Sequence, residues 1–327
     1  HISNYYFSDV GLAFADALLK ITGFEKGYFG NSGAEANEAA IKLARKYGYL
    51  NGGEKRRTVI TLENSFHGRT LATLTATGQE KFHPACFAPY PLHFKTIKAN
   101  DFDCLKDAFD DTTAALLIEC IQGEGGVNLI EPKWAQAAAD AARKAGAIVM
   151  ADEVQTGIGR TGSFLASDAL GFKPEVVTLA KGIAGGVPMG ACLFRGKAAD
   201  VFVAGDHQST FAGNPLACAA GLVVAETVSE PAFLDRVNHA GDYIRGAISS
   251  WNLPIVKDVR GKGLMIGTQI DPSVKPFDIE VRCLEKGLCT TTAGSDVVRF
   301  LPPLNISDKE IEKGLKIYKE VLMEFCK

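Results

Sequence analysis

The sequence lacks long apolar runs and a strong charge of either sign. No apolar run reaches the ~18–20 residues that a membrane-spanning helix needs. The formal net charge is −3, which argues against a large basic surface for nucleic acid. No basic stretch followed by an apolar one opens the chain, so a signal peptide is not indicated. With 46% hydrophobic residues over 327 positions, the composition is that of a globular protein of about two domains.

The cysteines and histidines lack the spacings that indicate metal sites. No two cysteines form a C-x-x-C pair and no two histidines form H-x-x-x-H, so we predict no metal. Most of the cysteines lie in apolar or helical stretches, and we interpret them as reduced thiols of a cytoplasmic protein. The eight cysteines are Cys86, Cys104, Cys120, Cys192, Cys218, Cys283, Cys289 and Cys326.

Short apolar runs alternate with helical patterns along most of the chain. Because parallel strands are buried on both faces, such runs indicate an α/β fold with a mainly parallel central sheet. The pattern changes near Pro254, so we expect a large domain over residues 1–240 and a smaller α+β domain over residues 241–327. The expected strands are 57–62, 114–119, 147–154, 176–179 and 190–194, and the expected helices include 10–22 and 134–145.

The stretch "FGNSGAEANEAAIKLARKYG", residues 29–48, indicates a helix that begins near Ser32. Ser32 and Glu35 have the spacing of a capping box, an apolar stripe follows at helical intervals, and Gly48 could close the helix. The simplest interpretation is a well-capped helix. The alternative is an anion site, because a glycine-rich helix start offers free backbone N–H groups and a positive dipole end. No G-K-[ST] follows, so the stretch is not a P-loop.

The stretch "AIVMADEVQTGIGRTG", residues 147–162, contains a G-x-G-x-x-G pattern at Gly157–Gly162. This pattern raises a remote alternative, a nicotinamide-dependent oxidoreductase. Asp152 and Glu153 argue against it, because they lie between the strand and the glycines and would repel a diphosphate. Carboxylates just past a parallel strand lie where open α/β sheets bind ligands. We therefore assign a function to Asp152, whereas Glu153 remains compatible with a solvated loop acid.

Lys181 follows the apolar run Val176–Leu179 and precedes a glycine-rich stretch. A buried ammonium is costly unless it is paired or loses its proton, so a lysine here needs a partner or a reaction. An amine with a lowered pKa can form a Schiff base with an aldehyde. Lys181, Asp152 and the helix start at Ser32 would together meet the three needs of pyridoxal phosphate: an amine, a partner for the ring nitrogen and a phosphate cradle.

These stretches resemble the class III aminotransferases, a family of fold type I pyridoxal-phosphate enzymes, and most closely its acetylornithine branch. The resemblance covers nearly the whole chain. One small departure is Cys120, where proline is common in the family. Family members have further residues before the stretch that matches His1, which agrees with the absence of a starting methionine, so we expect a preceding segment that helps to shape the substrate entrance. The matching stretches are "NSGAEANEAAIKLARKYG", "SFHGRTLATLTATG", "IECIQGEGGV", "ADEVQTGIGRTG", "LAKGIAGGVPMGA", "STFAGNPLACAAG", "VRGKGLMIG" and "VRFLPPLNI".

The resemblance assigns roles in cofactor binding to nine residues. Ser32, Gly33 and Ala34 would bind the phosphate. Phe66 would stack on the ring, and His67 would stack beside it or simply pack. Asp152 would pair with the ring nitrogen, Gln155 would lie near the ring hydroxyl, and Lys181 would form the Schiff base. Thr210 would reach the phosphate of the neighbouring subunit, which implies a homodimer with shared active sites.

The resemblance also implies the reaction and its substrate contacts. Arg69 and Arg299 would bind substrate carboxylates, and Glu124 would pair with Arg299 when no second carboxylate is present. The expected activity is transfer of the δ-amine of N-acetylornithine to 2-oxoglutarate, a step of arginine biosynthesis. Ornithine, N-succinylornithine and 4-aminobutyrate are alternative donors in the same class. A chain that folds without activity, for lack of its preceding segment, is a further alternative.

Overall fold

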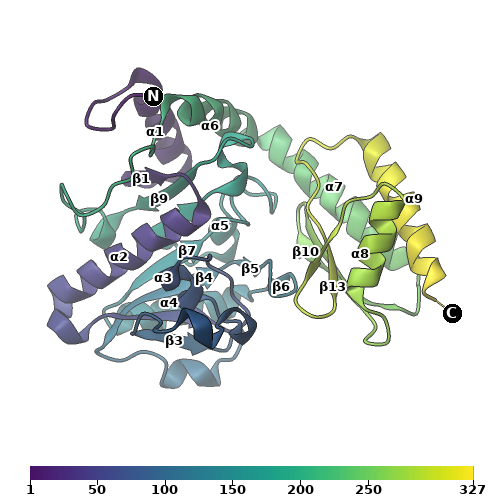
Figure 1. Ribbon diagram of the computed structural model, residues 1–327, viewed down its shortest axis with the longest axis horizontal. Coiled ribbons are helices and arrows are strands. Elements are labelled where there is room, and N and C mark those ends of the chain that lie inside the picture. The colour runs from purple at the N-terminus through teal and green to yellow at the C-terminus, as the bar shows by residue number, and fades with distance from the viewer. Residues whose placement is uncertain (327) are drawn as a thin grey trace.

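The computed structural model describes residues 1–326 and has a larger and a smaller lobe (Figure 1). A seven-stranded sheet forms the centre of the larger lobe, in the order β1-β9-β8-β7-β4-β2-β3. The neighbours from β3 to β8 are parallel, and β9 is antiparallel to both β8 and β1. These strands are β1 (Lys26–Gly30), β2 (Thr58–Leu62), β3 (Phe94–Ile97), β4 (Thr113–Glu119), β7 (Ile148–Asp152), β8 (Val176–Leu179) and β9 (Gly190–Phe194).

Helices cover both faces of this sheet. The long helix α2 packs on one face, while α1, α4 and α6 contribute to the core on the other face. A two-stranded ribbon, β5 with β6, lies apart from the main sheet. These elements are α1 (Asp9–Thr22), α2 (Gly33–Gly52), α3 (Leu71–Ala76), α4 (Pro132–Lys144), α5 (Ala166–Leu170), α6 (Pro215–Val228), β5 (Ile121–Gln122) and β6 (Asn128–Leu129). Single 3-10 turns are Gly53–Lys55, Glu80–Phe82, Ala85–Phe87, Asp103–Lys106, Lys181–Ala184 and Gly196–Ala198.

Side chains of the central strands alternate between the two faces, as the two-residue period of a strand requires. On β4, Leu116 and Ile118 enter the core beneath α1, α4 and α6, whereas Ala115 and Leu117 contact the core beneath α2. Every residue of β4 and β7 is buried. Burial on both faces explains why these strands are continuous apolar runs in the sequence.

The smaller lobe is an antiparallel sheet with three helices and its own core. The strand order is β10-β11-β13-β12. The expected architecture, a large domain with a mainly parallel sheet and a smaller α+β part, is therefore confirmed. The boundary expected between residues 240 and 241 falls inside α7, and its position stays a prediction. The elements are α7 (Pro231–Ser250), α8 (Pro276–Glu285), α9 (Asp308–Glu324), β10 (Val256–Lys262), β11 (Met265–Ile270), β12 (Thr291–Ala293) and β13 (Val297–Phe300).

The helices and the cysteines of residues 1–326 bear on the expectations about membranes and thiols. No single helix among them is both long and apolar enough to cross a membrane; α6 and α7 meet those criteria only as a pair, and that pair is bent by 75°. The cysteines are all unpaired thiols, of which Cys86 and Cys289 are exposed and the others are buried or half-buried.

Candidate active site

A cavity of about 370 Å³ opens at the C-terminal edge of β4, β7 and β8, against the start of α2. This is the edge at which open α/β sheets bind ligands. Most of the residues predicted for cofactor and donor binding line it, although they come from four separate parts of the chain. The predicted residues that line the cavity are Ser32, Gly33, Ala34, Phe66, His67, Arg69, Asp152, Gln155 and Lys181.

Strand alternation and register bring three polar side chains together beneath α2, and two of them, Asp152 and Glu119, line the cavity. Asp152 is the last residue of β7 and points to the same face of the sheet as Ile148 and Met150, which contact the core beneath α2. Glu119 on β4 and Thr178 on β8 are its direct partners across the parallel pairs. Since register partners in a sheet point to the same face, the three side chains form one row beneath the first turns of α2.

Asp152 is buried and held by several donors. Its Oδ2 lies 2.8 Å from Asn37 Nδ2 and 2.7 Å from His67 Nδ1, while its Oδ1 accepts the backbone N–H of Val154 at 3.0 Å. These contacts hold the carboxyl group of Asp152 in one place at the edge of the cavity, where it can face the ring nitrogen of a bound cofactor.

Glu119 is a second buried acid in the cavity, and it was not predicted from the sequence. Its Oε2 accepts the backbone N–H of Phe66 at 2.9 Å. Burial, and then the nearby charge of Asp152, raise the pKa of Glu119 well above its usual value, which favours its protonated form. The signal was present, because Glu119 ends an apolar strand just as Asp152 does.

Lys181 follows β8 after one residue. Its backbone has a positive φ of 50°, a conformation that residues other than glycine rarely adopt. Its side chain is exposed to the cavity, yet protein atoms enclose it on most sides. This enclosure lowers the pKa of Lys181, and the charges of Asp152 and Glu124 only partly oppose the shift. A larger fraction of neutral, nucleophilic amine results.

Ser32 is the N-cap of α2, and its side chain accepts the backbone N–H of Glu35 at 3.2 Å. The second half of the expected capping box is absent: Glu35 accepts the backbone N–H of Asn31 and not that of Ser32. Gly33 packs tightly, since a Cβ there would lie 2.6 Å from Val154 Cγ1. The backbone at Gly33 can therefore lie this close to Val154 only because glycine has no side chain. The free backbone N–H groups at this helix start suit an anion.

Arg69 lies over the ring of Phe82, with the ring of Phe66 nearby. Its guanidinium carbon is 4.2 Å from the ring centroid of Phe82 and 5.4 Å from that of Phe66. Within residues 1–326 no carboxylate lies within ion-pair distance of Arg69, and its side chain is exposed at the cavity. Stacking orients the guanidinium while its N–H groups stay available for a carboxylate.

Arg299, on β13 of the smaller lobe, is buried and in contact with Glu124. Its Nη1 lies 2.8 Å from Glu124 Oε1, 3.1 Å from Gln155 Oε1 and 2.7 Å from the carbonyl oxygen of Gly123. Burial opposes ionisation of Glu124, but Arg299 outweighs it and lowers the pKa of Glu124 below its usual value. The structure thus brings the predicted pair together, with Gln155 donating to Glu124 at 3.2 Å.

Two predicted features lie elsewhere. Thr210 is exposed and does not line this cavity; its neighbour Ser209 accepts a hydrogen bond from Asn4 through its backbone carbonyl. Glu153 is not a solvated loop acid, because it is fully buried and accepts the backbone N–H groups of Ala166 and Ser167 at the start of α5. Its role is to satisfy that helix start, so this interpretation was wrong.

The donor set of the cavity fits pyridoxal phosphate. That cofactor needs an amine for its aldehyde, an anion for its ring nitrogen and donors for its phosphate. Lys181, Asp152 and the start of α2 supply these groups around one cavity. In addition, His67 Nε2 is buried and has no hydrogen-bond partner among the described residues, so a polar atom remains free beside Asp152.

Comparison with known proteins agrees with this geometry. The family model described as aminotransferase class-III matches residues 1–322. The acetylornithine aminotransferase of Caldanaerobacter subterraneus subsp. tengcongensis is 44% identical over 326 residues, which cover 99% of this chain and 82% of the relative. That of Haemophilus ducreyi is 43% identical over 325 residues, or 99% of this chain and 81% of the relative.

Solved structures have the same fold. The ornithine aminotransferase of Toxoplasma gondii ME49 superposes with a TM-score of 0.93 at 30% identity, over 99% of this chain and 79% of that one. The N-acetylornithine aminotransferase of Stenotrophomonas maltophilia K279a gives 0.86 at 32% identity, over 99% and 82%. Family match, relatives and fold all agree with the cavity, and the chain belongs to the class III aminotransferases, which depend on pyridoxal phosphate.

Proposed function

We propose that this protein transfers the δ-amine of N-acetylornithine to 2-oxoglutarate, giving N-acetylglutamate semialdehyde and glutamate. The observation that carries the proposal is the unequal state of two arginines: Arg69 has no acidic partner among residues 1–326, whereas Arg299 is neutralised by Glu124. A donor with one free carboxylate would bind Arg69 and leave its far amine toward Lys181. The names of the relatives, acetylornithine aminotransferases, point to the same donor.

Lys181 and Asp152 would carry the chemistry. Pyridoxal phosphate, when bound, supplies an aldehyde that takes up the donor amine and a ring that withdraws electrons from the carbon beside it. Lys181 would move a proton at its Nζ as general base and then acid, a role that its lowered pKa suits. Asp152 would keep the ring nitrogen protonated through its negative charge.

Glu124 would decide which substrate reaches Arg299. An uncompensated guanidinium in an enclosed site is costly, so Arg299 stays paired while a donor with one carboxylate is bound. 2-Oxoglutarate brings a second carboxylate, which can replace Glu124 on Arg299 with two-point geometry. Free ornithine carries an additional ammonium near its carboxylate, next to Arg69, and should bind less well than its acetylated form.

A split between the two half-reactions tests these assignments. In single-turnover experiments, Arg69→Ala should slow the reaction with N-acetylornithine by about 10²-fold, because a charged two-point contact is lost. Arg69→Lys should recover only part of the rate. Arg299→Gln should slow the reaction with 2-oxoglutarate and leave the donor reaction nearly unchanged. Equal losses in the donor reaction for both arginines would contradict the proposed division of labour.

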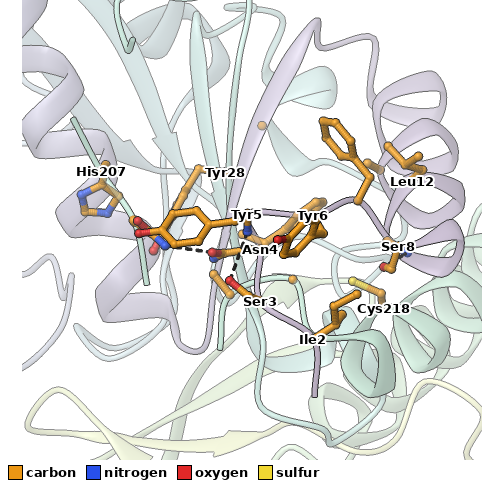
Figure 2. A pocket seen from close by; sticks show the side chains of 18 of the residues that line it. Ile2, Ser3, Asn4, Tyr5, Tyr6, Ser8, Leu12, Tyr28, His207 and Cys218 are labelled. Carbon is orange, nitrogen blue, oxygen red and sulfur yellow. Dashed lines mark hydrogen bonds between the residues drawn. The ribbon is translucent and has the colours of Figure 1, made fainter. Parts of the chain in front are cut away.

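We also propose a cytoplasmic homodimer. The support is an apolar surface at the N-terminal end of the chain, where Tyr5 is 81% and Phe7 88% exposed. These first residues line a pocket of about 510 Å³ together with Tyr28, His207 and Cys218 (Figure 2). Exposed apolar surface of this kind is typical of an interface. The exposed Thr210 lies close in sequence to residues that line this pocket, as a residue that reaches a neighbouring subunit would.

A further inference from the structure

Asn37, on the second turn of α2, joins two strands of the cavity floor. Its side chain is almost fully buried and donates from Nδ2 to Asp152 Oδ2 at 2.8 Å and to the backbone carbonyl of His67 at 2.8 Å. Its Oδ1 lies 2.7 Å from Thr178 Oγ1. Thr178 and Asp152 are register partners on neighbouring strands, so Asn37 connects the two side chains from its position on α2.

Hydrogen-bond chemistry fixes which way the amide of Asn37 faces. In the reverse orientation its carbonyl oxygen would face two acceptors, the carboxylate of Asp152 and the carbonyl of His67, with no hydrogen between them. In the observed orientation both N–H groups have acceptors, and the oxygen accepts from the hydroxyl of Thr178. Thr178 is fully buried, and its hydroxyl donates to the amide oxygen, which holds the amide in this orientation.

The consequence for Asp152 is an unequal use of its two oxygens. Oδ2 already has two partners, Asn37 and His67, which fill its in-plane acceptor positions. Oδ1 has one partner, the N–H of Val154, and keeps one position open. The carboxylate is therefore pinned through Oδ2, and Oδ1 is the oxygen left for a further donor in the cavity.

We infer that Asn37, oriented by Thr178, is a positioning residue that pins Asp152 and reserves Asp152 Oδ1 for the ring nitrogen of the cofactor. The inference rests on the proposed role of Asp152. Thr178 acts only through Asn37, since within residues 1–326 the hydroxyl of Thr178 bonds to Asn37 and makes no hydrogen bond with Asp152 itself. The two residues thus form a chain in which the hydroxyl orients the amide and the amide holds the acid.

The test uses matched variants and two measurements that do not depend on turnover. Thr178→Val removes the hydroxyl at constant shape, Thr178→Ser retains it, and Asn37→Ala removes the amide. Cofactor affinity is measured by fluorescence titration of the cofactor-free protein with pyridoxal phosphate. The second measurement is the pH midpoint at which the visible absorption of the bound cofactor changes. Circular dichroism and thermal unfolding check the fold of each variant.

Asn37→Ala should weaken cofactor affinity about tenfold, because one hydrogen bond to a charged group is lost. The pH midpoint of the absorption change should rise by up to about one pH unit. The reason is that a less protonated ring withdraws fewer electrons from the bond between the cofactor and Lys181. Thr178→Val should shift both readouts in the same direction by a smaller amount. Thr178→Ser should match the parent protein, as rescue by a retained hydroxyl requires.

A double-mutant cycle gives the sharpest outcome. If Thr178 acts through Asn37, Thr178→Val adds nothing to Asn37→Ala, so the two effects are strongly non-additive. Full additivity, or parental affinity and midpoint in Thr178→Val, would overturn the inference. Asp152→Ala separates this failure from a failure of the proposed function: if Asp152→Ala shifts both readouts and the other variants do not, only the positioning network is wrong.

Discussion

At the scale of single residues, the account depends most on Lys181. It is the only lysine that lines the cavity among residues 1–326, and enclosure lowers its pKa. Lys181→Ala should abolish both amine transfer and the cofactor attachment that borohydride makes permanent, as detected by mass spectrometry of the reduced protein. Reducible cofactor on another lysine of the variant would show that the assignment is wrong.

A second residue-scale prediction concerns Glu119 and pH. Its pKa in the folded protein is raised, so between its unfolded value, about 4.3, and the raised value the folded state holds a proton that the unfolded chain has lost. The free energy of unfolding then falls as pH rises through this window, by up to about 1.4 kcal/mol per pH unit. Glu119→Gln imitates the protonated acid at nearly constant shape and removes this dependence.

Urea unfolding of the cofactor-free protein at pH 5 and pH 8 measures the effect. In the Glu119→Gln variant the side-chain amide oxygen can still accept the N–H of Phe66, so the hydrogen bond itself is not the variable. We expect the gain in stability of the variant over the parent protein to be larger at pH 8 than at pH 5. Equal differences at both pH values would show that Glu119 ionises normally.

At the scale of elements, the start of α2 combines helix capping with anion binding. Ser32→Ala should weaken cofactor affinity, because the phosphate loses a hydroxyl and an ordered helix start. The matched control is Ser307→Ala at the start of α9 in the smaller lobe, where a full capping box is present. That variant should cost about 1 kcal/mol in stability and leave cofactor affinity unchanged. Equal losses of affinity would assign the Ser32 effect to general destabilisation.

Much of the fold could be predicted from single elements of the sequence. The mainly apolar runs that end in Glu119, Asp152 and Leu179 are strands, because burial on both faces leaves no place for charged residues inside them. Lys181 and Asp152 could be predicted as site residues for the same reason: each places a charge at the end of such a run. The same reasoning would have identified Glu119.

The contacts of Asn37 and Thr178 could not be predicted in this way. They depend on the register between β7 and β8 and on the position of α2 above them, neither of which a local pattern contains. Likewise, the pair of Glu124 and Arg299 joins two lobes and was expected only from the family resemblance. Glu153 was misjudged because its partners, the N–H groups of α5, come later in the chain.

At the scale of the whole molecule, the proposed shared active site predicts complementation between inactive variants. Lys181→Ala removes the amine of one subunit, and Thr210→Asp would place a carboxylate against the phosphate of the other. If each site uses Lys181 and Thr210 from different subunits, a mixed dimer has one intact site. Reassembly of the two variants should restore about a quarter of the parent activity, given random pairing. No recovery, in a mixture that sedimentation shows to contain mixed dimers, would place both residues in one subunit's site.

The identity of the donor tests the central claim most directly. The kcat/KM values of the complete protein should be measured with 2-oxoglutarate and each of N-acetylornithine, ornithine, N-succinylornithine and 4-aminobutyrate. Because Arg69 is available to a carboxylate and Arg299 is paired with Glu124, the account predicts the highest value for N-acetylornithine. A tenfold preference for ornithine or 4-aminobutyrate would contradict the proposed donor, although the protein would remain a class III aminotransferase.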